Sequence, residues 1–197
     1  KKREDARALI EKLSAGCPLE ARVCSIERKK EKKNPPLLYN LAELQNDCSK
    51  IFKISPDETL RIVQELYEKK LVTYPRTDAR VLSTAVAKEI HKNISGLRNF
   101  PPVKAFAQEI LEKGSYKGIE NTRYVNDMQI TDHYAIIPTG QGFGALGSLK
   151  GHGYGVYAMV ARRFLSIFYP PAIFHKVNLV TGMGEEGKEE KFFSAFK

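Results

Sequence analysis

The sequence predicts an α+β protein in which a mainly helical domain is inserted into a β-rich segment. Apolar residues recur at helical spacing through the middle of the chain, whereas runs rich in β-branched and aromatic residues occur near both ends. Strands need partners, so we expect the two flanks to pair with each other. The predicted domains are therefore 1–36 with 172–197, which is discontinuous, and 37–171.

The flanks contain one predicted helix and three predicted strands. Apolar residues at helical spacing predict a short helix over 4–13, and β-branched content with turn signals on either side favours a strand over 21–26. Near the other end, 174–181 and 191–196 are predicted strands, with a charged turn between them. The intervening run 27–33 is highly charged, and we interpret it as a solvated hairpin tip or linker, or alternatively as a loose DNA contact.

Two capped helices open the middle of the chain. Asn40 with Glu43, and Ser55 with Glu58, have the spacing of N-terminal capping boxes, and Pro56 suits a first helical position. The pair predicts a helix-turn-helix-like (CAP-like) core, a motif that many DNA-binding folds share. The predicted apolar stripes are formed by Leu41, Leu44, Cys48, Ile51 and Phe52, and by Leu60, Val63, Leu66 and Tyr67.

Further helices are predicted towards the C-terminus. Ser83 begins one that runs to about Ile94, and 103–113 supports another. Seven glycines within 140–155 predict a mobile loop, and 157–168 is again helical before two prolines end it. The core of this region is therefore expected to be helical.

Composition limits the functional classes. Of 197 residues, 42% are hydrophobic and 28% are charged, as in a globular protein, and the net charge of +9 favours an acidic partner. Cys17, Cys24 and Cys48 are odd in number and lack the spacing of paired metal ligands. No apolar run reaches the roughly 20 residues that a membrane helix needs. We expect a soluble, cytoplasmic protein with no membrane partner.

The most informative motif is Tyr74-Pro75-Arg76-Thr77-Asp78, which follows a predicted helix. A phenol can act as a nucleophile towards phosphate, and a guanidinium can stabilise charge on a phosphodiester under attack. Pro75 restricts the backbone between them. The alternative interpretation is that Tyr74 packs against the helix while Arg76 and Asp78 form a surface ion pair.

This motif and its context resemble the active-site tyrosine region of type IA DNA topoisomerases, in particular the topoisomerase III branch. The resemblance begins at 38–45, continues through 55–67 and 74–83, and returns at 131–139. It agrees with the predicted architecture, because these enzymes hold their tyrosine-bearing helical domain on a β-rich hinge or arch segment.

The resemblance assigns roles to three residues. It implies that Tyr74 attacks single-stranded DNA, becomes joined to a 5′-phosphate and leaves a 3′-hydroxyl, so that resealing needs no ATP. Arg76 would stabilise the developing charge, and His133 would contact the phosphate and assist proton movement. The sequence departs from the family at Tyr134, where His is common, and at Ala79, where Ser is common.

Four further residues are predicted to contact DNA or support the site. Thr77 could donate a hydrogen bond to a phosphate, and Asp78 could orient Arg76 or cap a turn. Arg162 and Arg163 could reach DNA phosphates, although solvated helix charges are the commoner fate of such residues.

The resemblance also implies a Toprim domain, in which an acidic cluster holds Mg²⁺, and nothing in this sequence matches it. The carboxylates Glu185, Glu186, Glu189 and Glu190 lie in a charged turn, where we expect them to be solvated. We therefore predict no metal site and no cofactor in this chain, and little activity without the Toprim domain of the same polypeptide. The expected partners are single-stranded and negatively supercoiled DNA of the bacterial nucleoid.

Two other functional classes fit parts of the sequence. A helix-turn-helix DNA-binding module would bind duplex DNA sequence-specifically, with Tyr74 in a structural role. A tyrosine recombinase would use the same nucleophile but would become joined to a 3′-phosphate. The polarity of a covalent adduct separates the recombinase from the topoisomerase.

Overall fold

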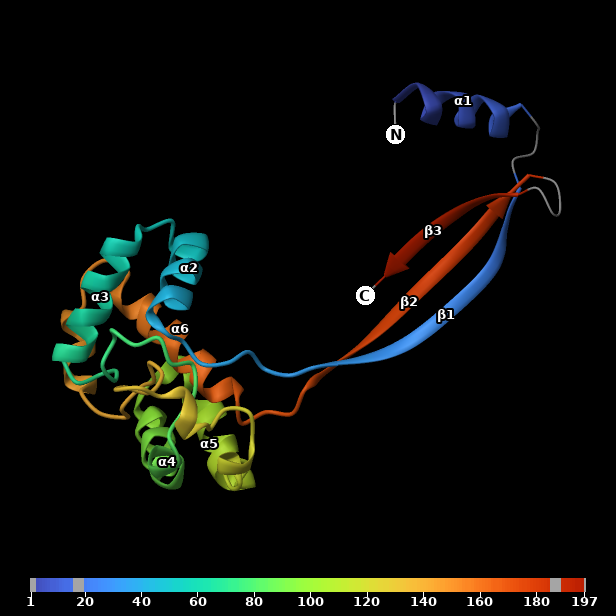
Figure 1. The fold of residues 1–197 in the computed structure, drawn as a ribbon. Coiled ribbons are helices and arrows are strands. Elements are labelled where there is room, and N and C mark those ends of the chain that lie inside the picture. Colours follow the sequence, from blue (N-terminus) through green and yellow to red (C-terminus); the bar gives the residue numbers. More distant parts are fainter. Residues whose placement is uncertain (1–2, 16–19, 185–188, 197) are drawn as a thin grey trace. The chain divides into compact units, whose positions relative to one another are not determined.

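A computed structural model describes residues 3–15, 20–184 and 189–196, and divides into two compact units. One unit comprises 1–34 with 171–197, and the other comprises 35–170. The chain thus passes from the first unit to the second and back again (Figure 1). Most of the predicted charged turn between the last two strands, and Cys17, lie outside the described residues.

The first unit consists of a helix and a three-stranded antiparallel sheet. Helix α1 (Arg3–Ser14) precedes strand β1 (Ala21–Lys33), and the sheet is completed by β2 (Ala172–Met183) and β3 (Glu190–Phe196) in the order β1-β2-β3. The predicted pairing of the N-terminal and C-terminal flanks is thereby confirmed.

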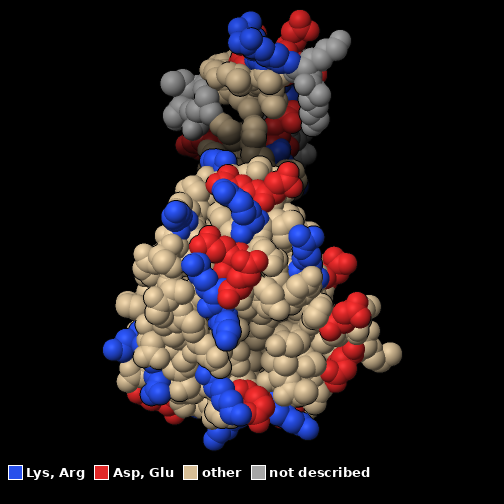
Figure 2. All heavy atoms as spheres, turned by 90° about the vertical axis from the view of Figure 1, so that its left-hand side faces the viewer, with Lys and Arg blue, Asp and Glu red and all other residues tan. Residues whose placement is uncertain are grey.

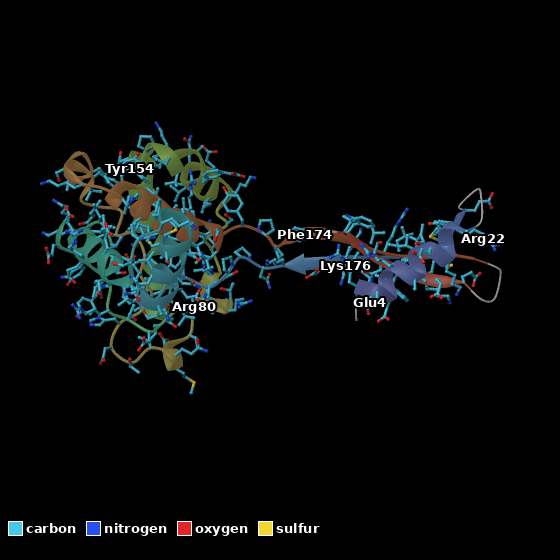
Figure 3. The ribbon with its side chains drawn as sticks, turned by 90° about the horizontal axis from the view of Figure 1, so that it is seen from above. Glu4, Arg22, Arg80, Tyr154, Phe174 and Lys176 are labelled. Carbon is cyan, nitrogen blue, oxygen red and sulfur yellow. The ribbon has the colours of Figure 1, made fainter. Side chains whose placement is uncertain are left out.

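The charged run from Glu27 to Lys33 was predicted to be a tip or linker, and this prediction was wrong. These residues continue β1 and pair with β2, from Glu27 opposite Asn178 to Lys33 opposite Ala172. Every side chain of β1 is exposed, so the pairing with β2 forms without burying any of these side chains. Phe174 and Lys176 lie along the partner strand β2 (Figure 3).

A bulge in β1 explains one glycine of the sheet. The register shifts between Val23 and Ser25, at Cys24. Gly182 lies opposite Arg22, and a Cβ atom at Gly182 would stand 2.7 Å from the Cys24 Sγ. Glycine therefore leaves room for the Cys24 side chain.

The second unit is mainly helical, as predicted. Three of its helices start at the predicted caps, because Asn40, Ser55 and Ser83 each accept a hydrogen bond from the backbone N–H three residues further on, at 2.9, 3.1 and 3.2 Å. The elements are α2 (Leu41–Phe52), α3 (Pro56–Glu68), α4 (Thr84–Gly96), α5 (Lys104–Lys113) and α6 (Gly153–Ser166), with 3₁₀ turns η1 (Leu97–Asn99), η2 (Pro101–Val103), η3 (Ile119–Asn121), η4 (Asp127–Gln129) and η5 (Phe143–Ser148).

Aromatic side chains fill the core of this unit around α6. Tyr157 and Phe164 of α6 are fully buried, and Phe100 meets the Tyr157 ring edge-on with 4.8 Å between centroids. Two predicted stripe residues lie outside this core, since Ile51 is 60% exposed and Tyr67 is 39% exposed. Both lie near the ends of their helices.

The glycine-rich stretch is more regular than the sequence predicted. It contains η5, and α6 already begins at Gly153. A Cβ atom at Gly155 would stand 3.0 Å from the Phe52 ring, so glycine lets the first turn of α6 pack closely against α2. Close packing therefore accounts for Gly155, which the sequence predicted to lie in a loop.

Candidate active site

Tyr74 lies in an extended segment that follows α3 and is fixed by a second segment from much later in the chain. The Thr73 N–H donates to the Ile137 carbonyl at 3.0 Å, and the Thr73 hydroxyl donates to the Ala135 carbonyl at 3.0 Å. The same hydroxyl accepts a hydrogen bond from the Ile137 N–H at 2.9 Å. The backbone on the N-terminal side of Tyr74 is therefore firmly positioned.

Thr77 fixes the other side of Tyr74. Its side chain is buried, with 8% exposure, and its hydroxyl donates to the His133 carbonyl at 2.8 Å. The hydroxyl also accepts from the Ala79 N–H at 3.1 Å. The predicted contact between Thr77 and a phosphate does not agree with these bonds, because the hydroxyl proton is used inside the protein. Thr77 instead ties the tyrosine segment to the histidine segment.

The Tyr74 ring contacts two other aromatic rings. Its centroid is 4.4 Å from that of His133, with 42° between the planes, and 5.4 Å from that of Tyr67, which meets it edge-on. Tyr74 is half-buried and His133 is exposed. The structure therefore brings together two of the three predicted catalytic residues. It also adds Tyr67, which the sequence analysis assigned only to an apolar stripe. Its position in the last turn of α3, shortly before Tyr74, was the signal that could have indicated this contact.

These rings border a pocket of about 620 Å³. Burial raises the pKa of Tyr134, the pocket-lining neighbour of His133, above the ordinary tyrosine value. Aromatic and ionisable groups predominate around the pocket. Its lining residues are Tyr67, Glu68, Lys70, Val72, Thr73, Tyr74, His133, Tyr134, Thr139 and Gln141.

Arg76 and Asp78 are both exposed, and they do not form the ion pair that the alternative interpretation required. Within the described part of the chain, the guanidinium of Arg76 has no hydrogen bond or ion pair, whereas that of Arg80 pairs with Glu43 at 3.4 Å. The Asp78 carbonyl accepts from the Asn40 side chain at 3.1 Å. Arg76 is thus available to an external anion.

The two arginines of α6 differ in their surroundings. Arg162 is exposed, whereas the Arg163 side chain is 15% exposed and pairs with Asp47 at 2.8 Å. Arg163 also donates to the Leu37 carbonyl at 3.0 Å and to the Tyr39 hydroxyl at 3.1 Å. Burial, followed by the hydrogen bond to Asp47, raises the pKa of Tyr39. The predicted DNA contact does not fit Arg163, because its guanidinium is occupied inside the protein.

The described residues provide no group of three or more His, Cys, Asp or Glu side chains that could hold a metal ion. Glu185 and Glu186 lie outside the described residues.

On the face of the helical unit seen in Figure 2, acidic and basic side chains are interspersed. Among the described residues, no helix combines the length and apolar character that a bilayer crossing needs.

Comparison with known proteins identifies the class of this fold and site. Residues 1–195 match the sequence profile of the DNA topoisomerase family, so the chain belongs to that family. Within it, the chain is a type IA member of the topoisomerase III kind, as the resemblance of its tyrosine region predicted.

Its relatives include DNA topoisomerase 3 of Bacillus subtilis strain 168, which is 36% identical over 170 residues, and that of Bacillus licheniformis, which is 38% identical over 168 residues. These alignments cover 85% and 83% of this chain but 22% of each relative, so the chain spans about a fifth of their length.

A similar fold occurs in the full-length topoisomerase I of Thermotoga maritima, with a TM-score of 0.62 and 22% identity. That comparison covers 97% of this chain and 29% of the other.

Proposed function

We propose that this chain is the tyrosine-bearing part of a type IA DNA topoisomerase that cleaves one DNA strand, lets another strand pass and reseals the break without ATP. The observation that carries the proposal is the contact between Tyr74 and His133, whose ring centroids are 4.4 Å apart beside a pocket. The exposed guanidinium of Arg76, two residues beyond Tyr74, supports it.

The reaction is a transesterification. The Tyr74 oxygen attacks the phosphorus of a phosphodiester, and a tyrosine–phosphate bond forms as the bond from phosphorus to the 3′-oxygen breaks. The phenol loses its proton and the leaving 3′-oxygen gains one, and His133 assists both transfers. Arg76 stabilises the charge on the non-bridging oxygens. The phosphotyrosine conserves the bond energy, and attack by the 3′-hydroxyl restores the strand.

The side chains described here do not fit Mg²⁺, because no acidic cluster gathers among them. The curated relatives are several times longer than this chain. We therefore propose that the rest of the polypeptide supplies an Mg²⁺-binding Toprim domain, and that the chain alone has little or no topoisomerase activity.

The other proposed roles concern DNA and movement. Arg162, which is exposed on α6, contacts a DNA phosphate, and Asp78 orients Arg76 once DNA is bound. The domain formed by 1–36 and 172–197 serves as the hinge or arch on which the helical, CAP-like domain 37–171 moves. The DNA is single-stranded or negatively supercoiled, and the site of action is the bacterial cytoplasm, at the nucleoid.

A covalent-adduct assay tests the proposal. The complete polypeptide is incubated with end-labelled single-stranded DNA and Mg²⁺, quenched with detergent and examined for label on the protein. We expect a 5′-phosphate linkage that Tyr74→Phe abolishes and that the control Tyr154→Phe, at an exposed tyrosine outside the pocket, retains.

The other outcomes separate the alternative classes. A 3′-phosphate linkage would indicate a tyrosine recombinase. DNA binding without any adduct would indicate a helix-turn-helix binding module and would overturn the proposal.

A further inference from the structure

Lys70 has a backbone conformation that is unfavourable for a lysine. Its φ is 60°, in the left-handed region, and among the described residues it shares this property with one other non-glycine residue, Lys53, with φ 59°. The Lys70 N–H donates to the Tyr67 carbonyl at 2.8 Å, and the Leu71 N–H donates to the Leu66 carbonyl at 2.9 Å. These two bonds define a helix C-terminal motif in which glycine is the usual residue at the position of Lys70.

The surrounding structure enforces this conformation. The Thr139 hydroxyl donates to the Lys70 carbonyl. A Cβ atom at Gly142 would stand 2.4 Å from the Lys69 carbonyl oxygen, so the segment that contains Thr139 and Gly142 lies directly against the end of α3. Lys70 is thereby held at the edge of the pocket that Tyr74 also lines.

The charge of Lys70 is available to a ligand. Its neighbour Lys69 pairs with Glu65 at 3.6 Å and donates to Ser148 at 3.1 Å. Lys70 is exposed and has no hydrogen-bond or ion-pair partner within the described ranges. Glu68, the acidic residue that lines the pocket, accepts a hydrogen bond from the Gln64 side chain at 3.1 Å.

We propose that Lys70 binds a backbone phosphate of single-stranded DNA next to the phosphodiester that Tyr74 attacks. Glycine would fit this backbone better than lysine, but only lysine supplies an ammonium group, a flexible point charge suited to phosphate. This inference rests on the proposed function and adds a residue to the same site.

Lys53 provides a matched control. It is the C-cap residue of α2, also with a left-handed backbone, and it does not line the pocket. Both lysines lie at the C-terminus of a helix, where a positive charge interacts favourably with the helix dipole. The two substitutions therefore remove the same kind of dipole interaction. A difference between them in DNA binding therefore reports on the pocket.

The test measures binding of a fluorescent oligothymidylate to the full 197-residue chain by anisotropy across a range of salt concentrations. Lys70→Gly and Lys53→Gly are both expected to raise the Tm, since glycine adopts the left-handed backbone freely. Lys70→Gly and Lys70→Gln are expected to weaken binding about fivefold at 0.1 M salt and to lower the salt slope by about 0.7, the effect of one lost phosphate contact. Lys53→Gly should retain both, as should Lys70→Arg.

Two results would overturn the inference. The first is an affinity and salt slope for Lys70→Gly and Lys70→Gln that equal those of Lys53→Gly. The second is the absence of measurable binding by the unsubstituted chain. The proposed function is decided separately, by the Tyr74-linked adduct in the complete polypeptide.

Discussion

Replacing Arg163 with methionine removes the largely buried guanidinium of α6 while keeping an apolar stem. The loss leaves Asp47 without its ion-pair partner and the Leu37 carbonyl without a donor. The guanidinium carbon also stands 4.1 Å from the centroid of the Tyr39 ring, so a cation–π contact disappears. Arg162→Met, one residue earlier and exposed, is the matched control.

The expected magnitude follows from burial. Breaking a buried ion pair by removing one partner costs about 3–5 kcal/mol. The Arg163 and Asp47 side chains are 15% and 23% exposed, so solvent screening places this case at the low end, at about 3 kcal/mol. That loss corresponds to a decrease in Tm of about 10 °C for a unit of this size. Arg162→Met should stay within about 0.5 kcal/mol of the unsubstituted chain.

Urea unfolding followed by circular dichroism measures both variants. We expect a lower midpoint and an unchanged slope for Arg163→Met. A double-mutant cycle with Asp47→Asn should give a coupling energy of about 1–3 kcal/mol. Equal midpoints for Arg163→Met and Arg162→Met would show that the internal network of Arg163 does not stabilise the fold.

Two further predictions concern the loops around the site. Thr77→Val removes the hydroxyl that joins the Tyr74 segment to the carbonyl of the histidine segment, and should cost about 1–3 kcal/mol in urea unfolding; the control Thr131→Val changes an exposed hydroxyl, and equal stability of the two variants would refute this role. Two hydrogen bonds from Thr84, one from its hydroxyl and one from its N–H, lower the pKa of Asp127. The stability that this carboxylate adds is complete above its unfolded pKa of about 4 and is lost as the pH falls through the lower folded pKa. The stability difference between the unsubstituted chain and Asp127→Asn should therefore be constant near neutral pH and shrink below about pH 4; a difference that does not change with pH in acid would contradict this assignment.

Local sequence signals predicted the helix starts well, because a cap and its partner lie within three residues of each other. Asn40, Ser55 and Ser83 all accept the expected hydrogen bonds. The signals failed where the cause was distant in sequence. The charged end of β1 forms a strand because β2 supplies its backbone partners, and Gly155 belongs to a helix because Phe52 packs against it.

The candidate site shows the same distinction between local and distant causes. The sequence by itself determined the chemical groups, namely a phenol, a guanidinium and an imidazole, together with the family to which their motifs belong. The tertiary structure alone decided which of these groups meet and which are free. It placed Tyr74 against His133 and turned Arg163 inward to Asp47, because hydrogen bonds and ion pairs between distant segments depend on how the chain packs. The left-handed backbone of Lys70 has the same origin, since the neighbouring segment around Thr139 holds it in place.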